Sequence, residues 1–347
     1  MAGIVDGCVL GMGNPLLDMQ VTVDGSTLQK YDLKADDSIL AEDKHMPLYD
    51  EVKEYPIIEY LAGGATLNTI KMIQWILDRP NACTYIGCIS EDEYGQILKD
   101  ECEKLKLRPR FQFSTDGAGT GKCAVLLNDK NRSMVTYLGA SKELTLKHVQ
   151  NPDTWCYVEK ARVYYIAGYA INSCYDGVLA IAQHASENGK LFCFNLSAPF
   201  LPTFFTEQID SIMPFVDVLF CNSEEAEAYA AKHGWDTKSI FEVARQIASY
   251  PCPSPSDKKR MVVVTRAKNP IVVAVAGEKE VRSYPVPMLA SDLIVDTNGA
   301  GDALAAGFIA DYLLRESVDR AIASGIKAAR YIIQKSGFSL GPRGDYV

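Results

Sequence analysis

The feature that most constrains the fold is a repeated alternation between short apolar runs and segments with helical periodicity. Apolar residues recur at helical spacing over 67–77 and 93–106. Short apolar runs typical of buried strands occupy 8–11, 84–89, 162–166, 191–196, 216–221 and 261–265. The last four runs are each expected to be followed by a helix. Such alternation predicts an α/β fold with a mostly parallel sheet and helices on both of its faces.

Four other stretches do not follow this alternation. Apolar and polar residues alternate over 19–23, and residues 111–113, 122–127 and 133–138 have the composition of strands separated only by turn residues. Strands without intervening helices are typical of antiparallel pairing. These stretches therefore predict a second, smaller sheet.

The two patterns predict a core with an inserted lid. We assign 16–64 and 111–139 to a small β-sheet lid domain, and 1–15, 65–110 and 140–347 to an α/β nucleotide-binding core. Because the lid comes from two separate stretches of chain, we expect it to be tied closely to the core. One further segment, SYPCPSPSDKKR at 249–260, is predicted to be a disordered loop.

Composition limits the classes of partner. The 347 residues have a formal net charge of −9, which argues against nucleic acid or an anionic membrane surface as a partner. The N-terminal segment MAGIVDGCVLGMGNP has no basic region and no long apolar core, and no stretch is long enough to span a bilayer. The ten cysteines form no CxxC pair, so we expect mostly buried thiols in a reducing, cytoplasmic compartment.

The segment DTNGAGD at 296–302 is the strongest candidate for chemistry. It follows a strand-like apolar run at 293–295 and opens a helical pattern. A glycine-rich turn at a helix N-terminus directs free N–H groups at one point, where the helix dipole also favours an anion. Asp302 is placed to accept the proton of an attacking hydroxyl. Alternatively, this aspartate only caps the helix, and no Walker A loop is present.

Two further motifs have the composition of ligand-binding turns. Gly63 and Gly64 precede the helix that contains Asn68, and adjacent glycines let a ligand approach the backbone closely. Asp18 ends the segment GNPLLD, which follows the first predicted strand and contains Asn14. Ligands bind outside the carboxyl ends of parallel strands, and a carboxylate can accept two ribose hydroxyls. Alternatively, both motifs are ordinary tight turns.

Taken in order along nearly the whole chain, these motifs resemble the ribokinase (PfkB carbohydrate kinase) family. DTNGAGD is similar to the family's signature. The segments LGMGNPLLD (10–18), ILAEDKH (39–45), KARVYYIAG (160–168), NLSAPF (195–200) and CNSEEAE (221–227) resemble the branch that phosphorylates adenosine. The resemblance implies a ribokinase-like three-layer sandwich with a β-sheet lid. It also implies transfer of phosphate from ATP to the 5′-hydroxyl of adenosine, giving AMP and ADP, with Mg²⁺ as cofactor.

The resemblance implies roles for the residues at the reacting centre. Asp302 is the general base, and the backbone N–H groups of Gly299, Ala300 and Gly301 form the anion hole. Arg132, in the NRS segment at 131–133, is implied to move toward the phosphates when the lid closes. Alternatively, Arg132 is only a solvated turn residue.

Other residues are implied to hold the two substrates. The nucleoside is expected to contact Asn14, Asp18, Gly63, Gly64 and Asn68, with Asp18 on the 2′- and 3′-hydroxyls. A flat slot for the base has Tyr169 and Phe200 as candidate walls, although aromatic residues are also ordinary core. ATP is expected to contact Asn195, Thr265 and Asn298. Asn222 and Glu225 match the family's NxxE motif, which organises Mg²⁺ through waters; alternatively, Glu225 only stabilises the first turn of a helix.

Two rival functions stay open at this point. One is a related kinase for another nucleoside or a sugar, such as inosine, guanosine, ribose or fructose. The other is a catalytically silent nucleoside-binding protein on the same fold. The resemblance further implies that the chain is a monomer whose partners are adenosine and ATP.

Overall fold

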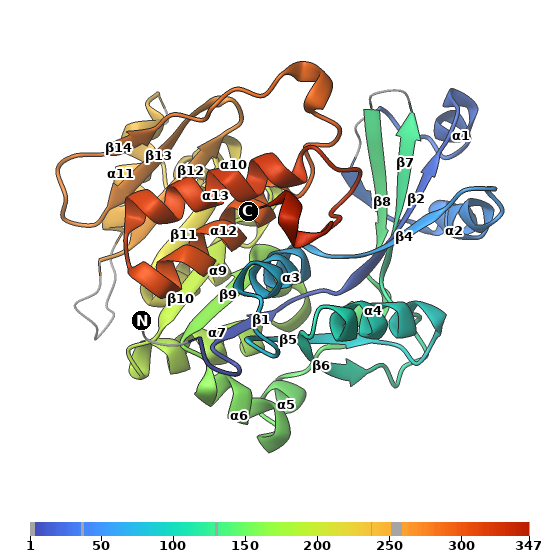
Figure 1. The fold of residues 1–347 in the computed structure, drawn as a ribbon, viewed down its shortest axis with the longest axis horizontal. Coiled ribbons are helices and arrows are strands. Elements are labelled where there is room, and N and C mark those ends of the chain that lie inside the picture. Colours follow the sequence, from blue (N-terminus) through green and yellow to red (C-terminus); the bar gives the residue numbers. More distant parts are fainter. Residues whose placement is uncertain (1–3, 36–37, 129–130, 237, 251–258, 347) are drawn as a thin grey trace.

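The larger of the two sheets has nine strands within the described part of the chain. The computed structural model describes residues 4–35, 38–128, 131–236, 238–250 and 259–346. The strand order is β14-β13-β12-β11-β10-β9-β1-β5-β6 (Figure 1). All neighbouring pairs are parallel except β12–β13 and β13–β14. The strands are β1 (Val9–Met12), β5 (Cys83–Ile89), β6 (Arg108–Phe113), β9 (Val163–Ala167), β10 (Leu191–Asn195), β11 (Val218–Asn222), β12 (Met261–Arg266), β13 (Asn269–Val275) and β14 (Arg282–Tyr284).

Both faces of this sheet are buried. Successive side chains of a strand point to opposite faces, and here neighbouring residues on both faces are apolar. Val9 and Val263 belong to one core cluster, whereas their neighbours Leu10 and Val262 belong to the other. The first cluster is completed by α3 (Ala65–Leu77), α4 (Glu93–Lys104), α12 (Ala300–Arg315) and α13 (Val318–Ile332). The second is completed by α5 (Leu146–Val149), α6 (Pro152–Lys160), α7 (Ile171–Glu187), α9 (Thr206–Ile212), α10 (Ser223–Lys232) and α11 (Ile240–Ser249). The predicted three-layer arrangement is confirmed.

The small sheet stands beside the large one and has α1 (Gly25–Lys30) and α2 (Met46–Lys53) on its outer side (Figure 1). Its strand order is β3-β8-β7-β2-β4. The strands are β2 (Leu16–Thr22), β3 (Ser38–Leu40), β4 (Glu59–Gly63), β7 (Lys122–Asn128) and β8 (Asn131–Tyr137). The expected antiparallel pairing is found for β2–β4 and β7–β8, but β2 runs parallel to β7 and β3 runs parallel to β8, so the sheet is mixed. The exact boundaries of a lid domain stay a prediction.

Three expectations about local structure are wrong. Residues 111–113 belong to β6, which pairs in parallel with β5 in the large sheet rather than in the small one. The run at 293–295 is not a strand, because Leu293 ends the short 3₁₀ helix η5 (Ser291–Leu293) and the run pairs with no strand in the described part of the chain. Finally, β12 is followed by antiparallel β13 and not by a helix. Of the predicted loop at 249–260, residues 251–258 lie outside the described residues.

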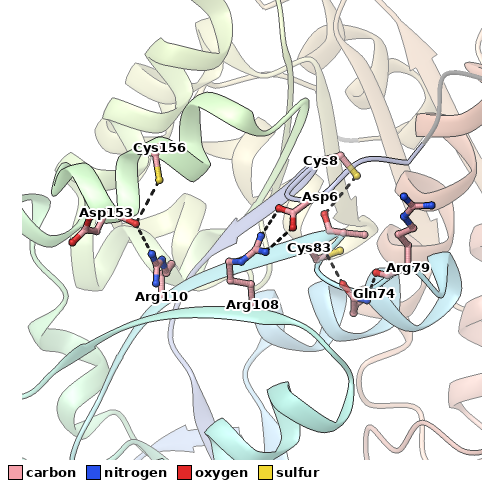
Figure 2. Close-up of polar contacts among 10 residues, drawn as sticks. Asp6, Cys8, Gln74, Arg79, Cys83, Arg108, Arg110, Asp153 and Cys156 are labelled. Carbon is pink, nitrogen blue, oxygen red and sulfur yellow. Dashed lines mark hydrogen bonds and ion pairs between the residues drawn. The ribbon is translucent and has the colours of Figure 1, made fainter.

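Polar contacts tie the amino ends of β1, β5 and β6 together, far along the strands from the site (Figure 2). Arg108 donates to both carboxylate oxygens of Asp6 at 2.6 and 2.7 Å. The side-chain oxygen of Gln74 accepts from the backbone N–H of Cys83 at 3.0 Å. Arg110 donates to the backbone oxygen of Asp153 at 2.7 Å. Since these groups satisfy one another or the backbone, we interpret this end of the sheet as structural.

Two predictions made from composition can be compared with the structure. Among the cysteines that the structure describes, all are buried except Cys156, which is half-buried. None of the described helices has both the length and the apolar character needed to cross a membrane.

Candidate active site

A cavity of about 500 Å³ lies between the two sheets, at the carboxyl ends of the parallel strands. The end of β10 contributes Asn195, the end of β11 contributes Asn222, and the segment after β1 contributes Asn14. This is where α/β sheets bind ligands. The structure brings every predicted site residue except Gly63 into the lining of this one cavity, namely Asn14, Asp18, Gly64, Asn68, Arg132, Tyr169, Asn195, Phe200, Asn222, Glu225, Thr265, Asn298, Gly299, Ala300, Gly301 and Asp302.

The N-terminus of α12 forms the floor of the proposed anion site. Gly299 precedes the helix with φ of 72°, and a Cβ there would lie 2.5 Å from the ring of Phe338, so only glycine fits. A Cβ on Gly301 would instead enter open space, with no heavy atom within 4 Å. The Asp296 carboxylate accepts a hydrogen bond from the backbone N–H of Asn298 at 2.9 Å and thereby supports the loop. The Ala300 N–H donates within the loop to the Thr297 backbone oxygen, at a long 3.4 Å. The start of a helix leaves N–H groups without an intrahelical partner, and such groups can bind an anion.

Asp302 lies in the first turn of α12 and is held from α3. The Asn68 amide nitrogen donates to its carboxylate at 3.1 Å, and the Thr69 hydroxyl donates to its backbone oxygen at 3.2 Å. Burial raises the pKa of Asp302 to about 7, and the carboxylates of Glu225 and Asp18 act in the same direction, while Asn68 opposes them. At neutral pH a large fraction of this carboxyl therefore stays protonated, whereas an ordinary aspartate would be fully ionised.

The glycine pair that ends β4 and caps the start of α3 leaves room for Asp18 and for the segment before it. A Cβ on Gly63 would lie 2.8 Å from both carboxylate oxygens of Asp18, so Gly63 acts by supporting Asp18 and not by lining the cavity. Gly64 has φ of 97°, and a Cβ there would lie 2.2 Å from the backbone oxygen of Asn14. Burial raises the pKa of Asp18 to about 6, against the opposing effect of the cations Arg132 and Lys71. The two glycines therefore allow three chain segments to approach closely.

Two asparagines present acceptors that the fold does not use. Within the described residues, the side-chain oxygens of Asn14 and Asn68 are buried and have no hydrogen-bond partner. Buried polar atoms are nearly always satisfied in native proteins. Because both side chains line the cavity, these oxygens are suited to accept hydrogen bonds from the hydroxyls or amino group of a bound molecule.

The aromatic pair lies at the wall of the cavity. Tyr169 and Phe200, the latter in α8 (Phe200–Phe204), have ring centroids 6.2 Å apart, and their side chains are partly exposed. The Tyr169 hydroxyl donates to the backbone oxygen of Ser197 at 3.2 Å. Rings that stay partly exposed next to a cavity are available to contact a planar ligand.

Arg132 is not a solvated turn residue. It lies on β8, its side chain is only 10% exposed, and it forms an ion pair with Asp296, the first residue of the DTNGAGD segment. It also donates to the Gln20 side-chain oxygen at 3.0 Å. This contact joins the small sheet to the loop that leads into the anion site.

Asn222 and Glu225 cap α10 and also face the cavity. Glu225 accepts from the backbone N–H of Asn222 at 2.9 Å and from its amide nitrogen at 2.8 Å, while its own N–H donates back to Asn222 at 2.8 Å. This is a capping box, so the expected helix-stabilising role is present. Burial raises the pKa of Glu225 to about 7. No group of three or more potential metal ligands from His, Cys, Asp and Glu occurs among the described residues.

The remaining candidates are partly used by the fold. The amide of Asn195 donates to the Tyr165 hydroxyl at 3.1 Å and accepts from the Ser197 N–H at 2.9 Å. The hydroxyl of Thr265 donates to the Cys221 backbone oxygen at 3.4 Å. Asn298 is exposed at the cavity rim. Residues that sequence reasoning missed include Asp296, which lay inside the motif, and Phe338, whose sequence context offers no signal.

Comparisons with known proteins identify the family of the chain. The sequence pattern of the pfkB family carbohydrate kinases matches residues 26–342. Adenosine kinase 2 of Arabidopsis thaliana is 38% identical over 341 residues, which is 98% of each chain. Two solved structures of adenosine kinase from Schistosoma mansoni, one in complex with 2-fluoroadenosine and one with adenosine in an occluded loop conformation, are each 49% identical, with a TM-score of 0.93 and coverage of 99% of both chains. The family resemblance is confirmed, and the chain belongs to the pfkB family of carbohydrate kinases.

Proposed function

We propose that this protein is an adenosine kinase that transfers the γ-phosphoryl group of ATP to the 5′-hydroxyl of adenosine, giving AMP and ADP. The observation that supports this most directly is the placement of Asp302 and the α12 N-terminus in the same cavity as Asp18, Asn14 and Asn68. A base and an anion site thus share one cavity with ribose-binding groups. The adenosine kinases at 38% and 49% identity support the choice of nucleoside.

In this proposal, the nucleoside is held from both sheets. Asp18 on β2 accepts the 2′- and 3′-hydroxyls, because an ionised carboxylate accepts several hydrogen bonds. The unused oxygens of Asn14 and Asn68 accept further hydrogen bonds, and Tyr169 and Phe200 flank the base. Placing the ribose against Asp18 directs its 5′-oxygen toward Asp302 and the start of α12.

The chemical step is an in-line displacement at phosphorus. The 5′-oxygen forms a bond to the γ-phosphorus, the bond to the β,γ-bridging oxygen breaks, and ADP leaves with that electron pair. Asp302 accepts the proton of the 5′-hydroxyl. The N–H groups of Gly299, Ala300 and Gly301 stabilise charge on the transferring group. A base with a pKa of about 7 is better matched to neutral pH than an ordinary aspartate.

The cavity residues fit a hydrated magnesium ion better than a bare one. Glu225 accepts one hydrogen bond at each oxygen and retains lone pairs for waters, and the described residues form no direct ligand cluster. Mg²⁺ keeps several waters and prefers oxygen ligands, so Asn222 and Glu225 would hold it through waters. When bound, it neutralises charge on the phosphates. Asn195, Thr265 and Asn298 are proposed to contact ATP itself.

Arg132 and the small sheet are proposed to complete the site. Arg132 lies on β8 of the small sheet and forms an ion pair with Asp296. This ion pair has to break before Arg132 can bind the phosphates. Closure of that sheet would also exclude water, which competes as a phosphoryl acceptor. The monomeric state and the cytoplasmic location stay predictions.

The test is transfer of label from γ-labelled ATP, with Mg²⁺, to adenosine, inosine, guanosine, ribose and fructose, with Asp302→Asn as a matched control. We expect rapid labelling of adenosine that is lost in the variant. Labelling of a different acceptor in place of adenosine would support the related-kinase alternative and would exclude adenosine as the substrate. Binding of adenosine with no labelling of any acceptor would instead support the silent nucleoside-binding alternative.

A further inference from the structure

A lysine is buried beneath the proposed ribose site. Lys71 lies on α3, one turn after Asn68, and is only 2% exposed. Its ammonium group donates to the backbone oxygen of Ala62 at 2.6 Å, and its nearest carboxylate oxygen, on Glu101, is 3.9 Å away. Burying a charged group carries a large desolvation cost unless it is well compensated, so a lysine here needs an explanation.

The contact of Lys71 leads to Asp18 in two short steps. Ala62 is paired with Leu17 on β2 and is followed directly by Gly63. The Asp18 carboxylate lies so close to the Gly63 backbone that a Cβ on Gly63 would be 2.8 Å from both of its oxygens, so the path of this backbone limits where Asp18 can lie. Fixing the Ala62 carbonyl therefore fixes the surface on which Asp18 lies.

The charge of Lys71 also acts on Asp18. The groups that face Asp18 are Arg132 from β8, Lys71 from α3, Asp296 from the segment before α12, Asp302 from α12 and the Cys123 thiol from β7. Of these, Arg132 and Lys71 favour the ionised carboxylate. Burial lowers the pKa of Lys71, while Glu101 and Cys102 from α4, together with Asp18, act to raise it. If Arg132 moves toward the phosphates, Lys71 is the cation that stays beside the ribose.

We propose that Lys71 is a positioning residue for ribose recognition, which anchors the Ala62 carbonyl beneath Asp18 and keeps the Asp18 carboxylate charged. This inference rests on the proposed function. It predicts that Lys71 affects nucleosides with 2′- and 3′-hydroxyls and has little effect on the phosphoryl transfer itself.

The test compares wild type with Lys71→Met, which has similar length and no charge. With adenosine at pH 7, we expect KM to rise about tenfold, the loss associated with one weakened charged hydrogen bond, while kcat stays within about twofold. With 2′,3′-dideoxyadenosine, which offers Asp18 no hydroxyl, the expected KM change is less than about twofold. In wild type, the KM for adenosine should rise below about pH 6, as Asp18 is protonated. That rise should begin at higher pH in Lys71→Met.

Equal effects on both nucleosides, with an unshifted pH dependence and a lower Tm, would overturn the proposal in favour of a packing role. Lys71→Gln serves if Lys71→Met does not fold, because its amide keeps a hydrogen-bond donor on this side chain while the charge is lost. An unshifted pH dependence in Lys71→Gln would likewise overturn the electrostatic role. Wild-type turnover of adenosine is measured first, so failure of the proposed function is recognised separately.

Discussion

The acid side of the pH–rate profile should report Asp302 directly. Only the ionised carboxylate accepts a proton, and burial raises the pKa of Asp302 to about 7. A single ionisation at that value leaves about one carboxyl in eleven ionised at pH 6 and about ten in eleven at pH 8. The ionisation of Asp302 alone should therefore raise kcat/KM for adenosine about tenfold between these pH values, after which the profile should level off. An ordinary aspartate would give a flat profile over this range.

Two variants separate Asp302 from its neighbour. Asp302→Asn should lower kcat by at least about 10²-fold, the lower end for loss of a general base, and should remove the limb near pH 7, leaving only the Asp18 limb near pH 6. Glu225 also has its pKa raised to about 7, so it is the competing source of the acid limb. In Glu225→Gln the loss of a nearby negative charge should move the Asp302 limb to lower pH. The maximal kcat/KM of Glu225→Gln is also expected to fall, so the pH at which the limb lies is the relevant measurement.

The assay is initial-rate formation of AMP at saturating ATP and Mg²⁺, from pH 5.5 to 9, in buffers of constant ionic strength. A flat profile in wild type, or near wild-type turnover in Asp302→Asn, would contradict the assignment of the base. Disappearance of the limb in Glu225→Gln would show that Glu225 is the titrating group.

Three further changes test other parts of the site. Asp18→Ala should raise KM for adenosine by roughly 10- to 150-fold, corresponding to about 1.5–3 kcal/mol for a charged hydrogen bond, with a smaller effect on kcat; unchanged adenosine binding by calorimetry would remove Asp18 from the site. Gly301→Ala should retain or raise Tm, because its Cβ meets open space, yet it should lower turnover. Gly299→Ala should lower Tm, because Gly299 has a φ of 72° and lies next to the Phe338 ring. The opposite ranking of the two variants in thermal melts would contradict this geometry. Because the pKa of Asp302 is about 7 when folded and 3.8 ordinarily, stability should fall as pH rises from about 4 to 7; Asp302→Asn should therefore stabilise the ligand-free protein at pH 8 more than at pH 4, and equal Tm differences at the two values would refute the burial.

Much of the fold could be predicted because strand burial leaves a clear pattern. Strands such as β12 are buried on both faces and therefore appear as continuous apolar runs. Residues 111–113 were misassigned because β6 lies at the edge of the large sheet and is only partly buried, so its sequence resembles that of an edge strand in either sheet. The run at 293–295 has the apolar composition of a buried strand but is not buried. Its side chains are 47%, 40% and 60% exposed and belong to an irregular segment.

The members of the site were predictable from motifs, but their electrostatics were not. Glycines at 299 and 301 are recognisable from the sequence, yet only the structure shows that one is required by φ and a ring while the other borders open space. The pKa of Asp302 depends on Asn68, Glu225 and Asp18, which come from three distant segments. Asp302 is desolvated only when these segments come together in the fold, so its raised pKa cannot be predicted from any one stretch of sequence.

Helix α3 connects the two chemical tasks proposed for the cavity. Through Asn68 and Thr69 it holds the side chain and backbone of Asp302, and one turn later Lys71 holds the carbonyl beneath Asp18. Because a helix is stiff over a single turn, a shift that moves Asp18 relative to Asp302 has to break one of these contacts. The distance between the ribose hydroxyls and the proton acceptor is thereby set mainly by one rigid element, even though the small sheet that contains Asp18 is the part expected to move on closure.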